Sequence, residues 1–579
     1  MRNFPYSTVF IVIIILFGIF SYTNSLHVPF IFDDINGILK NPLTTQLEVI
    51  PHLQVHRLRF LPYYSFAINF RIGGWDVFGY HLFNVTLHIA NSLLIFFLLR
   101  LILKTRNLKV DGSVSHHIIP FTAAVLFLVH PIQTQAVTYV SQRLTLMAAF
   151  FYLSTMLLYL KATREKLRLM PYIGAFIAMG VTLICKEIAF TLPITLVSLS
   201  LFFPSGRPWK KQVVLLLPFF AIPLTAYLIA IEISNSNILA LISLPSGTPS
   251  LSRTDYILTQ LNVIRTYIRL LIFPVRQNLD YDYPISRSLL EPNMTTSLLL
   301  LLSILTGALA ISKTNRLAAF GVLFFFIALL VESTIIPITD VINEHRVYLP
   351  SVGFFILVSI GYAYIYSKLG TPNRRHIATF ALFSIFALLI FATVRRNDIW
   401  SSEYKLWSDV VAKSPNKVRP RIALGLSLAN QNQLSEAVRE LQTAYALNQR
   451  TASRSQEAYD IAIHEQLASV YERLSDWEST GKHYEALLIY FPHDASLIET
   501  YALMYLRSGN SQKGQTLLQK ALEENPRSAT FHYNLGNLYF SEGNVVLAEQ
   551  QFREALKLNP DFEEAKHNLQ IITGNNTRQ

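Results

Sequence analysis

The sequence has a single cysteine, Cys185, in 579 residues, and only 15% of its residues are charged. One cysteine excludes both an intramolecular disulfide and a cysteine-based zinc ribbon. Soluble domains carry roughly 25% charged residues, so much of this protein's surface must face something other than water. The mean hydropathy of +0.35 agrees with that inference. The composition therefore predicts a membrane protein.

Long apolar segments recur through the first two thirds of the chain. Because a spanning helix needs about 20 mostly apolar residues, we predict about eleven spans. The first is expected to be retained, because no small-x-small cleavage site follows it. The spans are centred on residues 7–24, 82–103, 118–131, 144–160, 170–185, 188–204, 212–232, 295–312, 317–336, 352–367 and 377–394.

The net charge of +12 is explained by where the basic residues lie. Every second connection between spans is basic, beginning at Arg100, Lys161, Arg207, Lys313 and Lys368. The alternating connections collect acids instead. This is the positive-inside pattern, so we expect a cytoplasmic N-terminus and, after an odd number of spans, a non-cytoplasmic C-terminal part. The positive charge is read as an orientation signal, and no nucleic-acid partner is expected.

Beyond residue 397 the apolar runs end and a repeat begins. The pattern Leu535-Gly536-x-x-Tyr539 has counterparts centred on Ala502 and Ala468, each 34 residues apart. A period of 34 residues is typical of tetratricopeptide repeats. An earlier copy around Gly425 is offset by extra residues near 451–460. Such arrays present surfaces for proteins or peptides, although a rigid spacer remains an alternative.

Two adjacent carboxylates, Asp33 and Asp34, follow the first span. Neighbouring acids repel, which favours proton uptake by one of them, although a helix cap or a solvated turn would also explain them. Other polar residues in the same set of connections are expected to line a cavity instead of facing lipid. Acids and cations on one face suit transfer from an anionic lipid-linked donor. A carboxylate would activate the acceptor hydroxyl and a cation would neutralise the leaving phosphate.

An ordered set of motifs adds a family resemblance. The set is Phe32-Asp33-Asp34, Arg59-Phe60-Leu61-Pro62, Tyr80-His81-x-x-Asn84-x-x-x-His88, His130-Pro131, Lys186-Glu187, Arg346-Val347-Tyr348-Leu349-Pro350 and Arg396-Asn397-x-x-Trp400, all before the repeats. The chain resembles the transmembrane and tetratricopeptide repeat-containing O-mannosyltransferases, including their bacterial relatives, and we expect it to be one of the latter. The resemblance covers nearly the whole chain. Where this chain has Phe60-Leu61-Pro62, family members usually have Arg-Pro, and many carry more repeats.

The resemblance implies an all-α fold: a multi-pass class C glycosyltransferase domain followed by a tetratricopeptide α-solenoid. We expect a transmembrane domain at 1–396, a linker at 397–417, about four repeats with a capping helix at 418–571, and a tail at 572–579. Two segments, 53–73 and 130–143, are expected to lie along the membrane interface as amphipathic helices.

The expected activity is transfer of a monosaccharide, such as mannose, from a polyprenyl-phosphate donor to Ser or Thr hydroxyls of translocated proteins. The resemblance assigns catalysis to Asp33 and Asp34, and either could be the base. The residues expected to hold donor phosphate or sugar are Arg346, Arg143, Lys186, Glu187, Arg265, His81, His130 and Glu344. No cofactor is expected, and a divalent metal is possible but not favoured.

Two alternatives remain open from the sequence. One is a non-catalytic membrane scaffold whose repeats assemble envelope proteins, and the other is a glycosyltransferase that acts on lipid or polysaccharide acceptors. Expected partners are the lipid-linked sugar, an acceptor protein on the repeats, and the bilayer. A bacterial plasma membrane with periplasmic repeats is favoured over the endoplasmic reticulum.

Overall fold

The computed structural model describes residues 6–45, 59–104, 115–164, 166–234, 251–334, 337–338, 340–450 and 456–576. The chain divides into two compact units, Met1–Ser414 and Pro415–Gln579. Helices make up most of both units, and no strand occurs in the described ranges. The predicted all-α fold, with apolar helices followed by a repeat solenoid, is confirmed.

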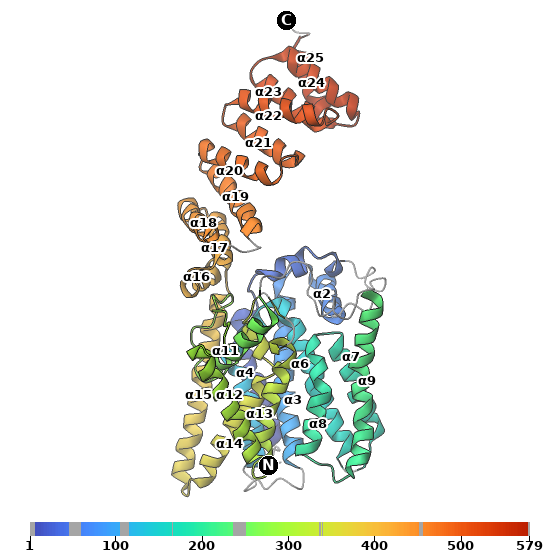
Figure 1. Cartoon of the computed structure of the whole chain (residues 1–579), viewed down its shortest axis with the longest axis vertical. Coiled ribbons are helices and arrows are strands. Elements are labelled where there is room, and N and C mark those ends of the chain that lie inside the picture. Colours follow the sequence, from blue (N-terminus) through green and yellow to red (C-terminus); the bar gives the residue numbers. More distant parts are fainter. Residues whose placement is uncertain are drawn as a thin grey trace. The chain divides into compact units, whose positions relative to one another are not determined.

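The first unit is a bundle of long helices joined by short helical turns (Figure 1). Its helices are α1 (Tyr6–Tyr22), α2 (Phe60–Gly73), α3 (Val77–Leu103), α4 (Ser115–Val129), α5 (Thr134–Thr138), α6 (Arg143–Thr163), α7 (Leu169–Leu183), α8 (Leu192–Phe202), α9 (Trp209–Ser234), α11 (Arg253–Ile272), α12 (Pro292–Ile311), α13 (Arg316–Thr334), α14 (Ser351–Lys368), α15 (Pro372–Ile399) and α16 (Glu403–Lys413).

Each predicted apolar segment coincides with one of these helices. Among the described residues, seven helices are long and apolar enough to cross a membrane, namely α1, α3, α6, α12, α13, α14 and α15. An eighth span is formed if α4 and the segment Pro131–Thr138 are counted together, although they meet at an angle of 52°. Crossing by α7 and α8, which are shorter, stays a prediction. Crossing by α9, which is not among the candidate spans, also stays a prediction.

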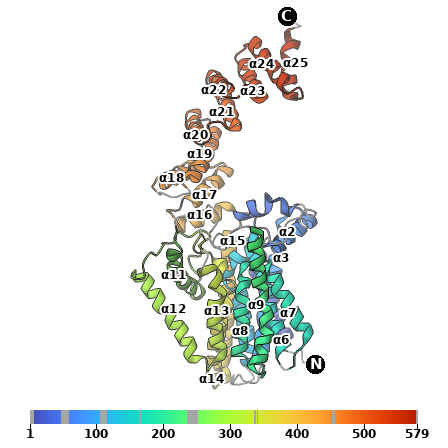
Figure 2. The same cartoon turned by 45° about the vertical axis from the view of Figure 1, so that its right-hand side comes forward.

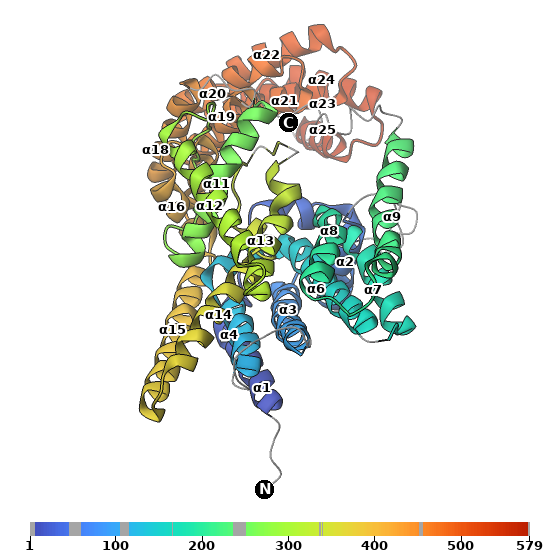
Figure 3. The same ribbon diagram turned by 60° about the horizontal axis from the view of Figure 1, so that its bottom comes forward.

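The centre of the first unit is built around α4. It packs against α1, α3, α14 and α15 (Figure 3), and the side chains from Phe121 through Val140 are buried without a break. The prediction that residues 130–143 form an amphipathic helix at the membrane interface is therefore wrong. A continuously buried segment has no polar face to turn toward lipid headgroups. Of the other predicted interfacial segment, residues 53–58 lie outside the described ranges, and residues 60–73 form α2.

The basic connections gather at the end of the bundle where α1 begins. Arg100 Nη1 donates to Ser7 Oγ at 2.8 Å, and Arg164 donates to the carbonyl of Lys104. The segment that carries Asp33 and Asp34 follows the opposite end of α1. Figure 2 shows α2 and α11 at that opposite end, away from the link between α14 and α15. The bundle thus separates basic from acidic connections, and which end is cytoplasmic stays a prediction.

Residues 397–417 were expected to be a linker, but most of them belong to the first unit. They contain the end of α15 and all of α16. Trp400 and Trp407 are buried there, and Arg396 pairs with Asp409 at 2.8 Å. Trp407, with Leu406 and Val410, gives α16 a buried apolar face, whereas Trp400 directly follows α15. The first unit therefore extends to Ser414.

The second unit is a stack of helix pairs with one closing helix. The pairs are α17 (Val418–Asn430) with α18 (Leu434–Gln449), α19 (Gln456–Arg473) with α20 (Trp477–Tyr490), α21 (Ala495–Arg507) with α22 (Ser511–Glu524), and α23 (Ala529–Ser541) with α24 (Val545–Leu558), followed by α25 (Glu563–Asn576).

Small residues let the helices of a repeat approach closely. A Cβ at Gly536 would meet the Phe552 ring at 2.7 Å, and one at Gly425 would meet Leu441 at 2.7 Å. Of the extra residues near 451–460, positions 456–460 extend α19 and 451–455 lie outside the described ranges. Of the predicted tail, residues 572–576 belong instead to α25, and residues 577–579 lie outside the described ranges.

Candidate active site

The two adjacent acids after α1 point into different surroundings. Asp34 is 1% exposed, and both of its carboxylate oxygens accept backbone N–H groups, from Ser141 at 2.7 Å and from Ile31 at 3.3 Å. Asp33 is exposed. Burial raises the pKa of Asp34 to about 7, against the opposing effect of these hydrogen bonds. The structure therefore separates the pair into a buried, fixed carboxyl and an exposed one.

The backbone at Phe32 produces this separation. Phe32 has a φ of 58°, a left-handed conformation that is uncommon for a bulky residue. Its ring stacks on Tyr139 and contacts Trp407 edge to face, and Tyr139 Oη accepts the Asp33 N–H at 2.8 Å. Backbone conformations of this kind persist where surrounding contacts over-determine them, and they cluster at functional sites.

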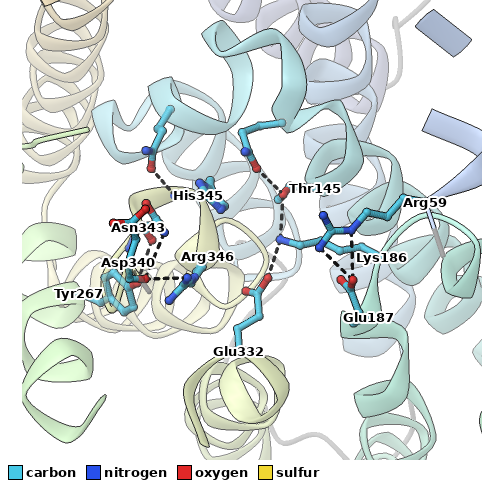
Figure 4. Close-up of polar contacts among 12 residues, drawn as sticks. Arg59, Thr145, Lys186, Glu187, Tyr267, Glu332, Asp340, Asn343, His345 and Arg346 are labelled. Carbon is cyan, nitrogen blue, oxygen red and sulfur yellow. Dashed lines mark hydrogen bonds and ion pairs between the residues drawn. The ribbon is translucent and has the colours of Figure 1, made fainter. Parts of the chain in front are cut away.

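A cluster of charged side chains lies at the ends of α6 and α13 (Figure 4). Lys186 Nζ donates to Glu332 at 2.6 Å and to Thr145 Oγ1 at 3.1 Å. Beside this pair, Arg59 donates to Glu187 at 2.9 Å. Lys186 and Glu332 are each about one-tenth exposed, so this is a largely buried ion pair, whereas Arg59 and Glu187 reach the surface. We call these four residues, together with His345 and Arg346, the charge cluster.

Arg346 contributes a cation that is held by backbone carbonyl groups. Its guanidinium donates to the carbonyls of Asp340 at 2.9 Å and Val341 at 3.2 Å. Neighbouring His345 is held by its backbone N–H, which donates to Gln135 Oε1 at 2.8 Å. Burial, and then the charges of Lys186 and Arg346, lower the pKa of His345 well below its usual value. A neutral imidazole is therefore expected there.

Glu344 lies next to the charge cluster but is fully occupied by donors. Its carboxylate accepts hydrogen bonds from Asn278 N at 2.6 Å, Tyr281 Oη at 2.6 Å and Gln277 Nε2 at 2.9 Å. Three donors compensate the buried negative charge. Glu344 thus fixes the connection between α11 and α12 against the short helix at Glu344–Val347.

Four members of the charge cluster line a small cavity of about 10 Å³, namely Lys186, Glu332, His345 and Arg346. It is large enough for about one water molecule. Two of the buried atoms on its lining residues, Glu332 Oε2 and His345 Nδ1, have no hydrogen-bond partner among the described residues. Buried polar atoms normally have a partner, so each such exception needs an explanation. A ligand or water between Lys186 and Arg346 would provide one.

The remaining predicted site residues lie elsewhere. Arg143 is fully buried: it donates to Asn84 Oδ1, Ser65 Oγ and the Tyr80 carbonyl, between the rings of Phe66 and Phe83. In this conformation it has no surface with which to meet a donor. Its role as a phosphate ligand stays a prediction.

His81, His130 and Arg265 also form hydrogen bonds that connect segments of the first unit. His81 Nε2 lies 2.8 Å from the Val28 carbonyl, and His130 Nδ1 accepts the Ile132 N–H at 3.2 Å. Arg265 donates to the Asn293 carbonyl and to Thr296 Oγ1, both at 3.2 Å, and so links α11 to α12. None of these three residues lines the small cavity, and sugar or phosphate binding by them stays a prediction.

Two residues that the sequence did not assign to the site prove to be part of it. Tyr139 carries no motif, and only its contacts with Asp33 and Phe32 reveal its position. Glu332 is an acid at the end of an apolar helix, which is a signal of function, but its pairing with Lys186 cannot be inferred from the sequence. Within the described ranges, no group of three or more His, Cys, Asp or Glu side chains could hold a metal ion.

Comparison with known proteins agrees with the motifs. A family described as "Tetratricopeptide repeat" matches residues 502–561. The chain is 24% identical to "Protein O-mannosyl-transferase TMTC3" of Mus musculus over 94% of its own length and 59% of that protein. It is 22% identical to "Protein O-mannosyl-transferase Tmtc3" of Drosophila melanogaster, over 91% of this chain and 64% of that one.

Two further matches complete the comparison. "Protein O-mannosyl-transferase F38B6.6" of Caenorhabditis elegans is 23% identical over 76% of this chain and 62% of that protein. A solved structure, "MamA 41-end from Desulfovibrio magneticus RS-1", covers 28% of this chain and 85% of its own, with 18% identity and a TM-score of 0.23, which is too low to support an argument.

The chain spans about three fifths of the length of the first two curated relatives, 59% and 60%. Over nearly all of its own length, it is a homologue of proteins curated as TMTC-type protein O-mannosyl-transferases, as its ordered motifs indicated.

Proposed function

We propose that this chain is a membrane-embedded protein O-mannosyltransferase that moves mannose from a polyprenyl-phosphate donor to Ser or Thr hydroxyls. The observation that carries the proposal is similarity to curated O-mannosyl-transferases across 94% of the chain. The separation of the two acids, Asp33 and Asp34, and the cations of the charge cluster, which lie in the same unit, give the proposal a chemical basis.

Asp33 is proposed as the general base and Asp34 as the residue that positions it. A base must come within hydrogen-bond reach of the proton that it removes, and only Asp33 of the two is exposed. Both oxygens of Asp34 are already engaged by backbone N–H groups. In the reaction, the acceptor hydroxyl oxygen bonds to the anomeric carbon, its proton passes to Asp33, and the carbon–oxygen bond to the prenyl phosphate breaks.

Lys186 and Arg346 are proposed to hold the departing phosphate. Cations aimed at the position where negative charge develops stabilise the transition state. The present cavity between them admits only about one water molecule, so a sugar phosphate requires a more open arrangement. We infer that the donor phosphate exchanges with Glu332 as the partner of Lys186, while Arg59 and Glu187 form the exposed edge of this site.

The repeats are proposed to bind the acceptor polypeptide, as such arrays bind extended ligands on their inner surface. The bilayer position follows from the charge pattern: the basic connections would face the cytoplasm, and catalysis and the repeats would lie on the other side. The corresponding location is a bacterial plasma membrane with periplasmic repeats.

The test uses the full chain purified into lipid nanodiscs. It is supplied with radiolabelled mannose as polyprenyl-phosphate mannose, or as GDP-mannose, together with Ser/Thr-rich acceptor proteins. The expected result is label on protein from the polyprenyl donor alone, released by β-elimination. Label only on glycolipid would instead support the alternative of a lipid or polysaccharide acceptor. If neither donor transfers mannose to any acceptor, the enzyme proposal fails and the membrane scaffold becomes the better account.

A further inference from the structure

The first unit contains a second polar cavity, larger than the one in the charge cluster. It has a volume of about 450 Å³ and lies between α11, the connection that follows α11, and the end of α16. Its lining includes Arg269, Arg276, Asn278, Lys413 and Ser414. We call it the α11–α16 cavity. None of the residues that the proposed transfer reaction uses lines it.

Positive charge dominates the α11–α16 cavity. Arg269, Arg276 and Lys413 lie on its wall, against the single carboxylate of Asp282. Arg269 donates to the Val275 carbonyl at 3.1 Å, and neither Arg269 nor Arg276 forms an ion pair with another described residue. Unneutralised guanidinium groups beside a cavity favour an anion, and their planar donors match phosphate oxygens.

The environment of Lys413 strengthens this positive field. Asp409 accepts from Lys413 at 2.6 Å and from Arg396 at 2.8 Å. The single carboxylate of Asp409 therefore forms ion pairs with both cations. Burial first, and then the charge of Arg396, lower the pKa of Lys413. An additional negative charge in the cavity would relieve the repulsion between these cations.

The backbone places Arg276 at the cavity at some energetic expense. Arg276 has a φ of 56°, a left-handed conformation that non-glycine residues rarely adopt. The connection around it is fixed by several contacts: Asn278 Nδ2 and Asp282 N both donate to Ser414 Oγ, at 2.8 and 3.0 Å. These hydrogen bonds hold the part of the wall that carries the cations in a defined conformation.

A polar atom in the same wall lacks a partner. Asn278 Oδ1 is buried and accepts no hydrogen bond from a described residue, although Asn278 Nδ2 is fully used. A buried acceptor without a donor loses its hydrogen bonds to water and forms none within the protein, which costs free energy. A hydroxyl group on a bound ligand would supply the donor. The cavity therefore combines affinity for an anion with a position for a hydroxyl.

Two exposed apolar side chains lie between Arg269 and Arg276 in the sequence. Phe273 and Val275, between the two arginines, are 64% and 60% exposed. α11 packs against the candidate spans α12 and α13, and Figure 2 shows it beside one end of these helices. We therefore infer that this connection lies near the membrane surface. Exposed apolar residues beside cations are the pattern of a lipid-binding interface.

We propose that the α11–α16 cavity binds the phosphate of a lipid whose headgroup carries hydroxyl groups. Arg269, Arg276 and Lys413 would contact the phosphate, Asn278 Oδ1 would accept a headgroup hydroxyl, and Phe273 and Val275 would lie against the acyl or prenyl chain. Two sources share this chemistry: a bilayer phosphoglycerol lipid and a prenyl phosphosugar. The proposal does not depend on the transfer reaction proposed above.

The test measures binding to the full chain in detergent micelles. Dioctanoyl-phosphatidylglycerol is compared with dioctanoylglycerol, which lacks the phosphate, and with glycerol 1-phosphate, which lacks the chains. We expect saturable binding of the first ligand only. The variant R269Q/R276Q should weaken it by about tenfold or more, whereas Arg287→Gln, an exposed arginine of the same connection outside the cavity lining, should leave it unchanged. Competition by a short prenyl phosphosugar distinguishes the sources: displacement at lower concentration than phosphatidylglycerol itself identifies the prenyl lipid.

A second measurement keeps the proposal falsifiable if the double variant does not fold. A photoactivatable phosphatidylglycerol is crosslinked to the wild-type chain in nanodiscs, and the labelled peptides are identified by mass spectrometry. Labelling of residues 266–283 and 403–414 is expected. Equal binding of dioctanoylglycerol, equal effects of the arginine and control variants, or crosslinks confined to other helices would overturn the proposal.

Discussion

The carboxylate of Asp34 accepts the backbone N–H of Ser141 at 2.7 Å, across 107 residues of sequence. This hydrogen bond ties the segment after α1 to the start of α6, and it leaves Asp33, one residue earlier, exposed. Both features of the proposed catalytic pair, a fixed backbone and an accessible carboxylate, depend on this contact.

Asp34 makes the stability of the first unit depend on pH. Burial raises its pKa in the folded protein to about 7, above the ordinary value of 3.8, so the folded state holds this proton more tightly than the unfolded chain does. Ionisation then disfavours folding: the contribution of Asp34 should be most favourable below about pH 4 and should fall as the pH rises toward about 7.

Thermal unfolding of the purified chain between pH 4 and pH 8 measures this dependence. Asp34→Asn removes the titrating group, so the melting temperature of the variant should change less over this window than that of the wild type. A variant with the same pH dependence as the wild type would show that Asp34 titrates normally in the folded state.

Hydropathy was sufficient to predict the helical bundle, because a buried or lipid-facing helix needs a continuous apolar run that a sequence displays directly. The repeats were predictable for a similar reason, since Gly536, Ala502 and Ala468 recur every 34 residues. What hydropathy could not show is the break at His130-Pro131, where α4 ends and the chain turns by 52° while staying buried.

The candidate site was predictable as a set of residue types but not as a set of contacts. Asp33, Asp34, Lys186 and Arg346 were identified by motif. Arg143 looked equivalent to Lys186 in the sequence, yet its guanidinium is enclosed by Asn84, Ser65 and Tyr80. Whether a cation lines the site or is enclosed by other side chains depends on contacts between helices that are distant in the sequence. A single sequence does not show these contacts.

Removing only one partner of the ion pair between Lys186 and Glu332 should lower the free energy of unfolding. Lys186→Met leaves the Glu332 carboxylate buried without its cation, and losing one partner of a buried pair costs about 3–5 kcal/mol. The double variant K186M/E332Q removes both charges and should recover a large part of that loss. Chemical denaturation monitored by tryptophan fluorescence compares the variants. A double variant that is no more stable than Lys186→Met would contradict a direct pair.

α13 and α14 cross at a pair of glycines. A Cβ on Gly353 would lie 2.2 Å from the Gly321 carbonyl oxygen, and one on Gly321 would lie 2.9 Å from the Gly353 carbonyl oxygen. Small residues permit this close approach between apolar helices. Because the obstacle is backbone, Gly353→Ala should push the helices apart and lower the thermal stability measurably.

Gly361 provides the matched control, since it lies on the same helix and a Cβ added there would meet nothing within 4 Å. Gly361→Ala should leave the melting temperature unchanged or raise it slightly, because alanine favours a helix over glycine by about 1 kcal/mol. If both substitutions had the same effect, the close crossing would not be needed for stability.

The most direct test of the account is the rate of mannosyl transfer by Asp33→Asn in the nanodisc assay. Losing a general base should lower kcat by about 10²–10⁴-fold while KM for the donor changes little, because the charge cluster is intact. Asp76→Asn is the control: Asp76 caps α3 by accepting the Phe78 N–H, and asparagine caps equally well. Wild-type activity in Asp76→Asn, with kcat reduced by about 10²-fold or more in Asp33→Asn, is the predicted result. Undiminished transfer by Asp33→Asn would contradict the mechanism.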